Sequence, residues 1–181
     1  MRNKPEVMMD LRYPVGPFEF EGTLSNEQRE AMIAEIAATP ERMRAAVAGL
    51  NDDQLDTPYR PEGWTVRQVV HHVPDSHLNS YTRFKLAITE DHPTIRAYDE
   101  NLWANLADAR TAPVDMSLDL LESLHRRWVV FLRSFDEKDF ARTFQHPEIG
   151  VVSVDKNVAL YAWHGRHHVA HITSLRERNG W

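Results

Sequence analysis

The sequence predicts an all-α fold: a four-helix bundle with an irregular N-terminal arm and a long crossover connection. Two observations support this. Apolar residues recur at spacings of three and four along four long segments, as on the buried face of a helix, and the alternation typical of strands is almost absent. Helices of this length bury their apolar faces against one another. The 181 residues, 42% of them hydrophobic, predict an arm over residues 1–24 and a single domain over residues 25–181.

The arm and the first helix are separated by a capping signal. Residues 1–24 contain three prolines and two glycines and lack a helical period, so we expect an arm that lies over the domain. A helix is expected from about Ser25 to Gly49, because Ser25 and Gln28 have the spacing of a capping box. Pro40 is expected to break or bend this helix.

The second helix is predicted to begin in the stretch "GWTVRQVVHHV". Thr65 and Gln68 again form a capping-box pattern, and valines follow at spacings of three and four. Pro74 is expected to kink the helix, which should end near residues 91–93.

The second half of the chain predicts a long connection and two more helices. Residues 92–115 should form the connection, with a short helix in "DENLWANLADA", and this length is sufficient to cross the end of the bundle. The third helix is expected from about Ser117 to Phe135 and the fourth from about Asp155 to Arg178, with a short β-like turn at 144–154.

Composition excludes several classes of function. A net charge of −6 argues against general nucleic-acid binding, which needs a basic surface. The chain has no cysteine, so disulfides, thiolate catalysis by the protein and cysteine-type zinc sites are excluded. We see neither a signal peptide nor an apolar run long enough for a membrane helix. We therefore expect a soluble cytoplasmic protein that acts on a small molecule.

Histidines are concentrated in "HGRHHVAH", residues 164–171, which holds four of the ten in the chain. His164 and His168 form one pair at a spacing of four, and His167 and His171 form another. Residues four apart point the same way from a helix, so either pair could chelate a metal ion. The first pair lies on the inward stripe and is modestly favoured. From this helix alone, metal binding and a structural role both remain open.

The second helix carries a polar stripe of its own. His72, Asp75 and Asn79 share one face of a mostly apolar helix, and polar groups inside a bundle need partners. A metal or a water-filled cavity would supply them, whereas a solvent-facing stripe is the structural alternative. Three imidazoles around Zn²⁺ or Ni²⁺ would leave a coordination position open. His125 is another candidate, although its arginine neighbours favour a position at the solvent boundary.

An ordered series of blocks resembles the YfiT branch of the DinB-like superfamily over nearly the whole chain. The blocks are "YPVGPFE", "RPEGWTVRQVVHHVPDSHLNSYTRFKLAITED", "YDENLWANL", "LHRRWVVFLRSF", "HPE" and "YAWHGRHHVAHITSLRERNGW". Proteins of this kind are labelled metal-dependent hydrolases, and the label does not rest on a known substrate. The resemblance implies a four-helix bundle, a homodimer, and one divalent metal per chain, with zinc expected first and nickel second. It implies His72, His164 and His168 as the ligands.

Three functions follow as hypotheses. The first is a metal-dependent hydrolase, with Asp75 or a carboxylate of the "YDE" stretch (Asp99 or Glu100) as general base or as a partner of the metal ligands. The second is a thiol S-transferase resembling the bacillithiol transferases, in which Arg83 or Arg166 would hold an anionic thiol. The third is a non-catalytic, metal-stabilised binding module.

Overall fold

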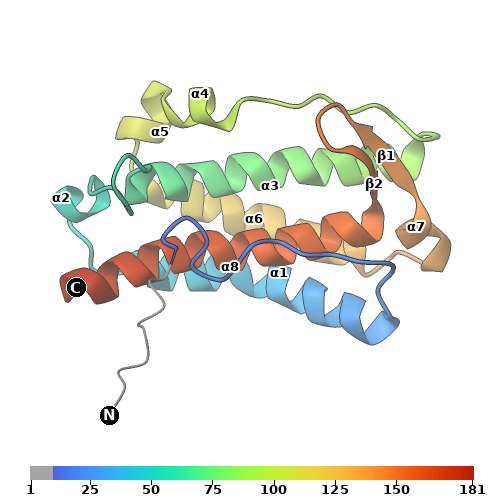
Figure 1. Cartoon of the computed structure of the whole chain (residues 1–181), viewed down its shortest axis with the longest axis horizontal. Helices are drawn as coiled ribbons and strands as arrows, with labels where there is room; N and C mark the ends of the chain where they lie inside the picture. The colour runs from blue at the N-terminus through green and yellow to red at the C-terminus, as the bar shows by residue number, and fades with distance from the viewer. Residues whose placement is uncertain (1–9) are drawn as a thin grey trace, which may run out of the picture.

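The computed structural model describes residues 10–181, and four long helices dominate it (Figure 1). They are α1 (Asn26–Val47), α3 (Val66–Thr89), α6 (Val114–Leu132) and α8 (Val154–Asn179). The shorter elements are α2 (Asp52–Leu55), α4 (Glu100–Ala104), α5 (Ala107–Thr111), α7 (Glu137–Ala141), β1 (Thr143–His146) and β2 (Gly150–Ser153). The predicted helical bundle is confirmed. The β-like turn is a two-stranded antiparallel hairpin, and the short helix expected in the connection is two helices, α4 and α5.

The two predicted capping boxes are present. The Ser25 hydroxyl accepts a hydrogen bond from the Gln28 amide, and the Gln28 side chain accepts one from the Ser25 amide. Thr65 and Gln68 do the same at the start of α3. Each box satisfies two backbone donors that the first turn leaves without partners.

Of the two outcomes predicted for Pro40, a break is wrong, because α1 continues past it. α3 also continues past Pro74, where a kink and not a break was predicted. A proline inside a helix leaves the carbonyl four residues earlier without its usual donor. For Pro40 that carbonyl belongs to Ile36, and it accepts a hydrogen bond from His125 Nδ1 at 2.6 Å. Tertiary contacts therefore stabilise a helix that the local sequence disfavours.

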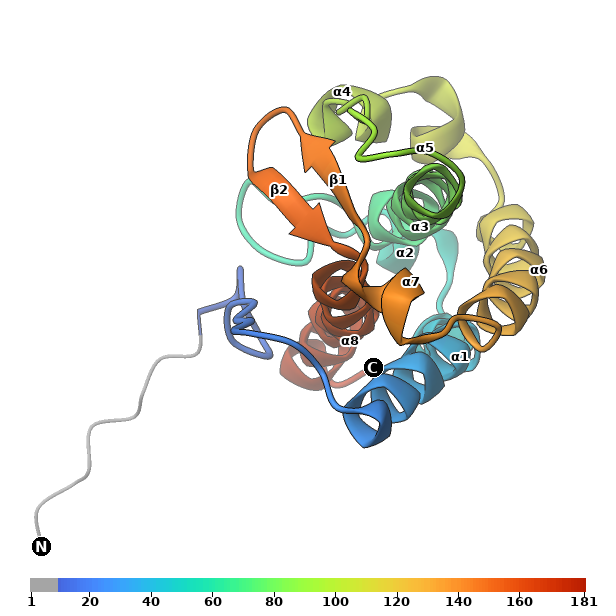
Figure 2. The same ribbon diagram turned by 90° about the vertical axis from the view of Figure 1, so that its right-hand side faces the viewer.

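Of the three pairs of consecutive long helices, only α3 and α6 lie side by side. α1 packs against α6 and α8, and α3 packs against the same two, so α1 and α3 lie diagonally opposite (Figure 2). The connection between α3 and α6 carries α4 and α5 over the outer face of α3. This is the long crossover that the sequence predicted.

Residues 10–24 have no helix or strand and run along α8. Trp163 Nε1 donates to the Gly16 carbonyl at 3.1 Å, and the Leu24 amide donates to Asp155 Oδ2 at 3.2 Å. The part of the arm prediction that covers residues 1–9 lies outside the described residues. No helix within residues 10–181 is both long and apolar enough to cross a bilayer.

Candidate metal centre

A layer of histidines, all buried except the half-buried His164, separates two apolar cores inside the bundle. The core at the hairpin end includes Phe84, Trp128 and Val158. The core at the opposite end is built around other residues of the same helices, such as Val69 and Leu121. Between them lie five histidines: His72 and His77 from α3, His125 from α6, and His164 and His168 from α8.

Three of these histidines converge on one point. The distance from His164 Nε2 to His168 Nε2 is 3.2 Å, and that from His164 Nε2 to His72 Nε2 is 3.4 Å. Ligands held about 2.0–2.1 Å from a tetrahedral ion would be about 3.3–3.4 Å apart, so the separations fit one zinc-sized ion. The ligand set predicted from the sequence is thus brought together, and these three residues could hold a metal.

Local sequence explains how α8 presents two of these rings. His164 and His168 are one helical turn apart, and the residue between them that faces α1 is Gly165. A Cβ at Gly165 would lie 2.9 Å from Thr39 Cγ2 and 3.2 Å from Thr39 Cβ, and would also collide with Thr39 Oγ1. Only a glycine lets α8 approach α1 this closely with His164 and His168 turned inward.

Burial keeps the three rings neutral. Desolvation lowers the pKa of His72 to about 4 and holds the pKa values of His164 and His168 well below their usual range. A neutral imidazole has one nitrogen lone pair, which is the form that ligates metals. Three lone pairs that face one another without a cation repel, so the donor set fits a divalent ion.

The other pair of the stretch also gathers around His168. His167, His168 and His171 form a second cluster that could hold a metal, and the Nδ1 atoms of all three are buried without a hydrogen-bond partner. His171 Nε2 donates to the Arg12 carbonyl at 3.2 Å. Because a neutral ring offers one lone pair, His168 can serve only one of the two clusters at a time.

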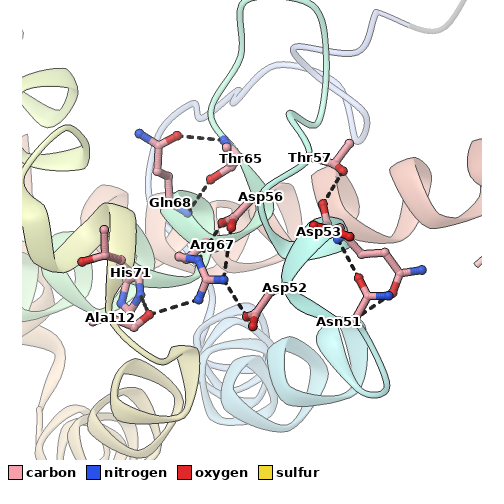
Figure 3. A network of polar contacts seen from close by, with 12 residues as sticks. Asn51, Asp52, Asp53, Asp56, Thr57, Thr65, Arg67, Gln68, His71 and Ala112 are labelled. Carbon is pink, nitrogen blue, oxygen red and sulfur yellow. Dashed lines mark hydrogen bonds and ion pairs between the residues drawn. The ribbon is translucent and has the colours of Figure 1, made fainter.

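His71, the first histidine of "VVHHV", faces away from the cluster. Its Nε2 donates to the Ala112 carbonyl at 3.1 Å, and its Nδ1 accepts from Ser117 Oγ at 2.7 Å. The same Ala112 carbonyl accepts from the buried Arg67, whose guanidinium also binds Asp52 and Asp56 (Figure 3). This network ties α2, the start of α3 and the end of the crossover together, and so fixes the rotation of α3 that turns His72 inward.

His77 and His125 are deeply buried as well. They are 0% and 1% exposed, so the expectation that His125 lies at the solvent boundary is wrong. Its arginine neighbours in the sequence point elsewhere on the helix, while the His125 ring lies 2.7 Å from His77 Nδ1. His77 Nε2 in turn lies 2.9 Å from His164 Nδ1. Sequence reasoning missed this connection because its members come from three helices.

A pocket of ≈ 400 Å³ opens onto the three converging rings. Its lining includes the predicted Glu100 but not Asp75, which is half-buried beside it with a pKa raised by burial to about 6. Asp99 instead caps α4, where its Oδ1 accepts from the amides of Asn101 and Leu102. The pocket therefore receives one of the three predicted carboxylates.

Several other lining residues were not predicted. They include the carboxylates Glu62 and Glu148, the aromatic residues Trp64 and Tyr98, and Arg60. Of the two predicted arginines, Arg83 lines the pocket, whereas Arg166 lies outside it and contacts Glu35 at 3.4 Å. The only signal for these residues was their place in the quoted blocks.

Glu62 has an unusual backbone. It follows Pro61 in a turn closed by a hydrogen bond from the Gly63 amide to the Arg60 carbonyl, and its φ is 57°. The position after proline in such a turn normally takes glycine or asparagine. A glutamate that accepts this strain in a pocket wall is a candidate for a role in binding or catalysis.

Comparison with known proteins places the chain in a family. Residues 35–172 match the model of the DinB superfamily. A Bacillus mycoides protein, provisionally named as a metal-dependent hydrolase, is 56% identical over 96% of this chain and 100% of its own length. A Bacillus cereus protein with the same provisional name is 55% identical over the same shares.

Two solved structures share the fold. YfiT from Bacillus subtilis, described as a probable metal-dependent hydrolase with an unusual four-helix bundle topology, is 47% identical. It superposes with a TM-score of 0.93 over 94% of this chain and 98% of its own. TT2238, a four-helix bundle protein, is 18% identical over 78% of this chain and 94% of its own, with a TM-score of 0.53, and supports the fold alone. Taken together, the bundle, the matched family model and the close relatives show that this chain is a YfiT-like member of the DinB superfamily.

Proposed function

We propose that this chain is a metal-dependent hydrolase that binds one divalent ion through Nε2 of His72, His164 and His168. The observation that carries the proposal is the convergence of these three nitrogens, with separations of 3.2 and 3.4 Å from the central one. An ion there would supply Lewis-acid chemistry: it would lower the pKa of a bound water and polarise a carbonyl or phosphoryl oxygen. Zinc is the first choice and nickel the second.

Side chains of the pocket would orient a small substrate. Among residues 10–181, Arg83 has no carboxylate within ion-pair distance, although it lines the pocket of an acidic protein. An unmatched guanidinium favours a substrate that carries a carboxylate or phosphate. Trp64 packs on His72 with ring centroids 4.6 Å apart, and so covers one side of the ligand cluster from water.

We propose Glu100 as the group that takes a proton from the attacking water. It lines the pocket, and its carboxylate lies on the first turn of α4, above α3. Asp75 was the other candidate from the sequence, and its position outside the pocket lining makes it the weaker one. Glu100→Gln should lower kcat by about 10²–10⁴-fold and leave metal content unchanged, as expected for loss of a general base.

The first experiment is elemental analysis of the untagged protein and two sets of variants. The triple variant His72→Ala, His164→Ala, His168→Ala should lose the roughly one zinc or nickel per chain expected of the wild type. The double variant His167→Ala, His171→Ala is the matched control and should keep it. Metal retained by the triple variant, or lost from the control alone, would move the site to the second cluster. Hydrolysis is then assayed on anionic esters, amides and phosphoesters.

Thiol transfer is the second candidate function. Arg83 is the observation that favours it, because an arginine in the pocket would hold an anionic thiol, which must come from outside a cysteine-free chain. The assay is consumption of an electrophile by metal-loaded protein with and without added small thiols. Consumption that requires the thiol would favour transfer over hydrolysis. Metal binding with no turnover in either assay would favour the non-catalytic module.

We also propose a homodimer, as the resemblance implies. Leu102, Leu106 and Met116 are 67%, 55% and 65% exposed, which is high for large apolar side chains and provides surface that a second copy could cover. Light scattering at micromolar concentration should give about twice the chain mass. The mass of a single chain would contradict this part of the proposal.

A further inference from the structure

A chain of three hydrogen bonds leads from the proposed metal ligand His164 to the backbone of α1. His164 Nδ1 lies 2.9 Å from His77 Nε2, and His77 Nδ1 lies 2.7 Å from His125 Nε2. The last link joins His125 Nδ1 to the carbonyl oxygen of Ile36 at 2.6 Å. The chain thus crosses the bundle from α8 through α3 and α6 to α1.

The Ile36 carbonyl is available because of Pro40. In an α-helix a carbonyl accepts from the amide four residues later, and proline has no amide hydrogen. A buried carbonyl without a donor is costly, so it takes another partner. Here the partner is the ring of His125, which is 1% exposed.

This end point fixes the direction of every hydrogen bond in the chain. A carbonyl can only accept, so the proton of the neutral His125 ring lies on Nδ1 and its Nε2 is left as an acceptor. His77 must then donate from Nδ1 and accept at Nε2, which makes His164 a donor from Nδ1. The lone pair of His164 therefore lies on Nε2, the atom nearest to His72 and His168.

We propose that Pro40 sets the tautomer and ring orientation of His164 through the Ile36 carbonyl, His125 and His77. Pro40, His77 and His125 are then positioning residues of the metal centre, although Pro40 belongs to a helix that supplies no ligand. The inference rests on the proposed function in one respect, the assignment of His164 as a ligand. Partners of this kind typically change metal affinity by about 10–100-fold when they are removed.

The first test is Pro40→Ala, which restores an amide that can bond the Ile36 carbonyl in competition with His125. The zinc dissociation constant is measured by competition with a chelator, and the midpoint of thermal unfolding is measured on metal-free protein. We expect zinc affinity to fall about 10–100-fold. The unfolding midpoint should not fall, because alanine is the better helix former. A merely structural proline would change the midpoint and leave affinity as it was, and that result would overturn the proposal.

Pro74→Ala is the matched control. It makes the same substitution inside α3, in a helix that carries both His72 and His77, without freeing or blocking the Ile36 carbonyl. Its effect on zinc affinity should be small. An equal loss of affinity in the two variants would overturn the proposal, because it would show that any proline removal disturbs the site.

A second measurement needs no variant. Nitrogen-15 NMR of the histidine rings should find the proton on Nδ1 in His77, His125 and His164, both with zinc and without it. A proton on Nε2 in any of the three would overturn the proposed direction. If the wild type binds no zinc, the proposed function fails, while the tautomers of metal-free protein still decide whether the chain runs as proposed.

Discussion

Gly165→Ala tests the close approach of α8 to α1. In an ordinary helix interior this substitution stabilises a protein by about 1 kcal/mol, because glycine is the poorer helix former. Here the new Cβ would lie 2.9 Å from Thr39 Cγ2, whereas carbon atoms pack best about 3.5–4.0 Å apart. Thr39 is 2% exposed and its hydroxyl donates to the Glu35 carbonyl at 3.0 Å, so its side chain has little room to move.

The two effects oppose each other, and the collision should win. Overpacking a tight core typically costs about 1–3 kcal/mol, and three Thr39 atoms collide at once, so after the gain of about 1 kcal/mol from helix propensity we expect a net loss of up to about 2 kcal/mol. Thr39→Ala removes two of those three atoms. In that background Gly165→Ala should be neutral or slightly stabilising, which gives a coupling energy of about 1–3 kcal/mol.

Urea unfolding of the four metal-free proteins measures this cycle. Zinc affinity should also fall in the Gly165→Ala variant, because a shift of α8 displaces the rings of His164 and His168. The packing argument fails if Gly165→Ala alone stabilises the protein by about 1 kcal/mol. It also fails if the cost is the same with Thr39 and with alanine at that position.

Three further outcomes are expected. Glu62→Gly should relieve the strain of the positive φ of 57° and raise the free energy of unfolding by up to about 1 kcal/mol, while the turnover rate falls. A lower free energy of unfolding in urea would contradict the claim that Glu62 is strained. Burial lowers the pKa values of His125 and His171 to about 4, so between about pH 6.5 and pH 4 the unfolded chain binds protons that the folded one does not. The free energy of unfolding of the metal-free protein should therefore decrease as the pH is lowered through that window. Urea midpoints that stay constant from pH 7 to pH 4.5 would refute this. Asp155→Asn should lower the free energy of unfolding by about 3–5 kcal/mol, since it leaves Arg29, 11% exposed in its side chain, without the carboxylate it binds at 2.8 Å. A loss below about 1 kcal/mol in urea would show that the pair is screened.

The helices could be predicted from the sequence because their signals are local. Ser25 and Thr65 cap α1 and α3, and each pairs with a glutamine only three residues later in the sequence. The spacing of apolar residues then indicates how far each helix extends. Pro40 shows the limit of such reasoning. Its effect depends on whether a distant side chain takes up the freed carbonyl, and His125 is 85 residues away in the sequence.

The candidate site divides in the same way. The i,i+4 spacing of His164 and His168 is a local signal, whereas the choice of His72 over its neighbour depends on contacts of α3 with the crossover. Glu62 and Arg83 come from a loop and from the far half of α3, and only the packing of the bundle brings them to one pocket. Their placement is set by tertiary structure, which single-sequence patterns do not encode.

The diagonal order of the bundle has a consequence for biosynthesis. A nascent chain that ends before residue 154 has α6 but lacks α8, the second helix that packs against both α1 and α3, and it carries only one of the three converging nitrogens. In such a chain the proposed ligand set is incomplete. Arrival of α8 supplies the other two nitrogens and closes the ring of helices in the same event, so the proposed site can form only when synthesis of the bundle is complete.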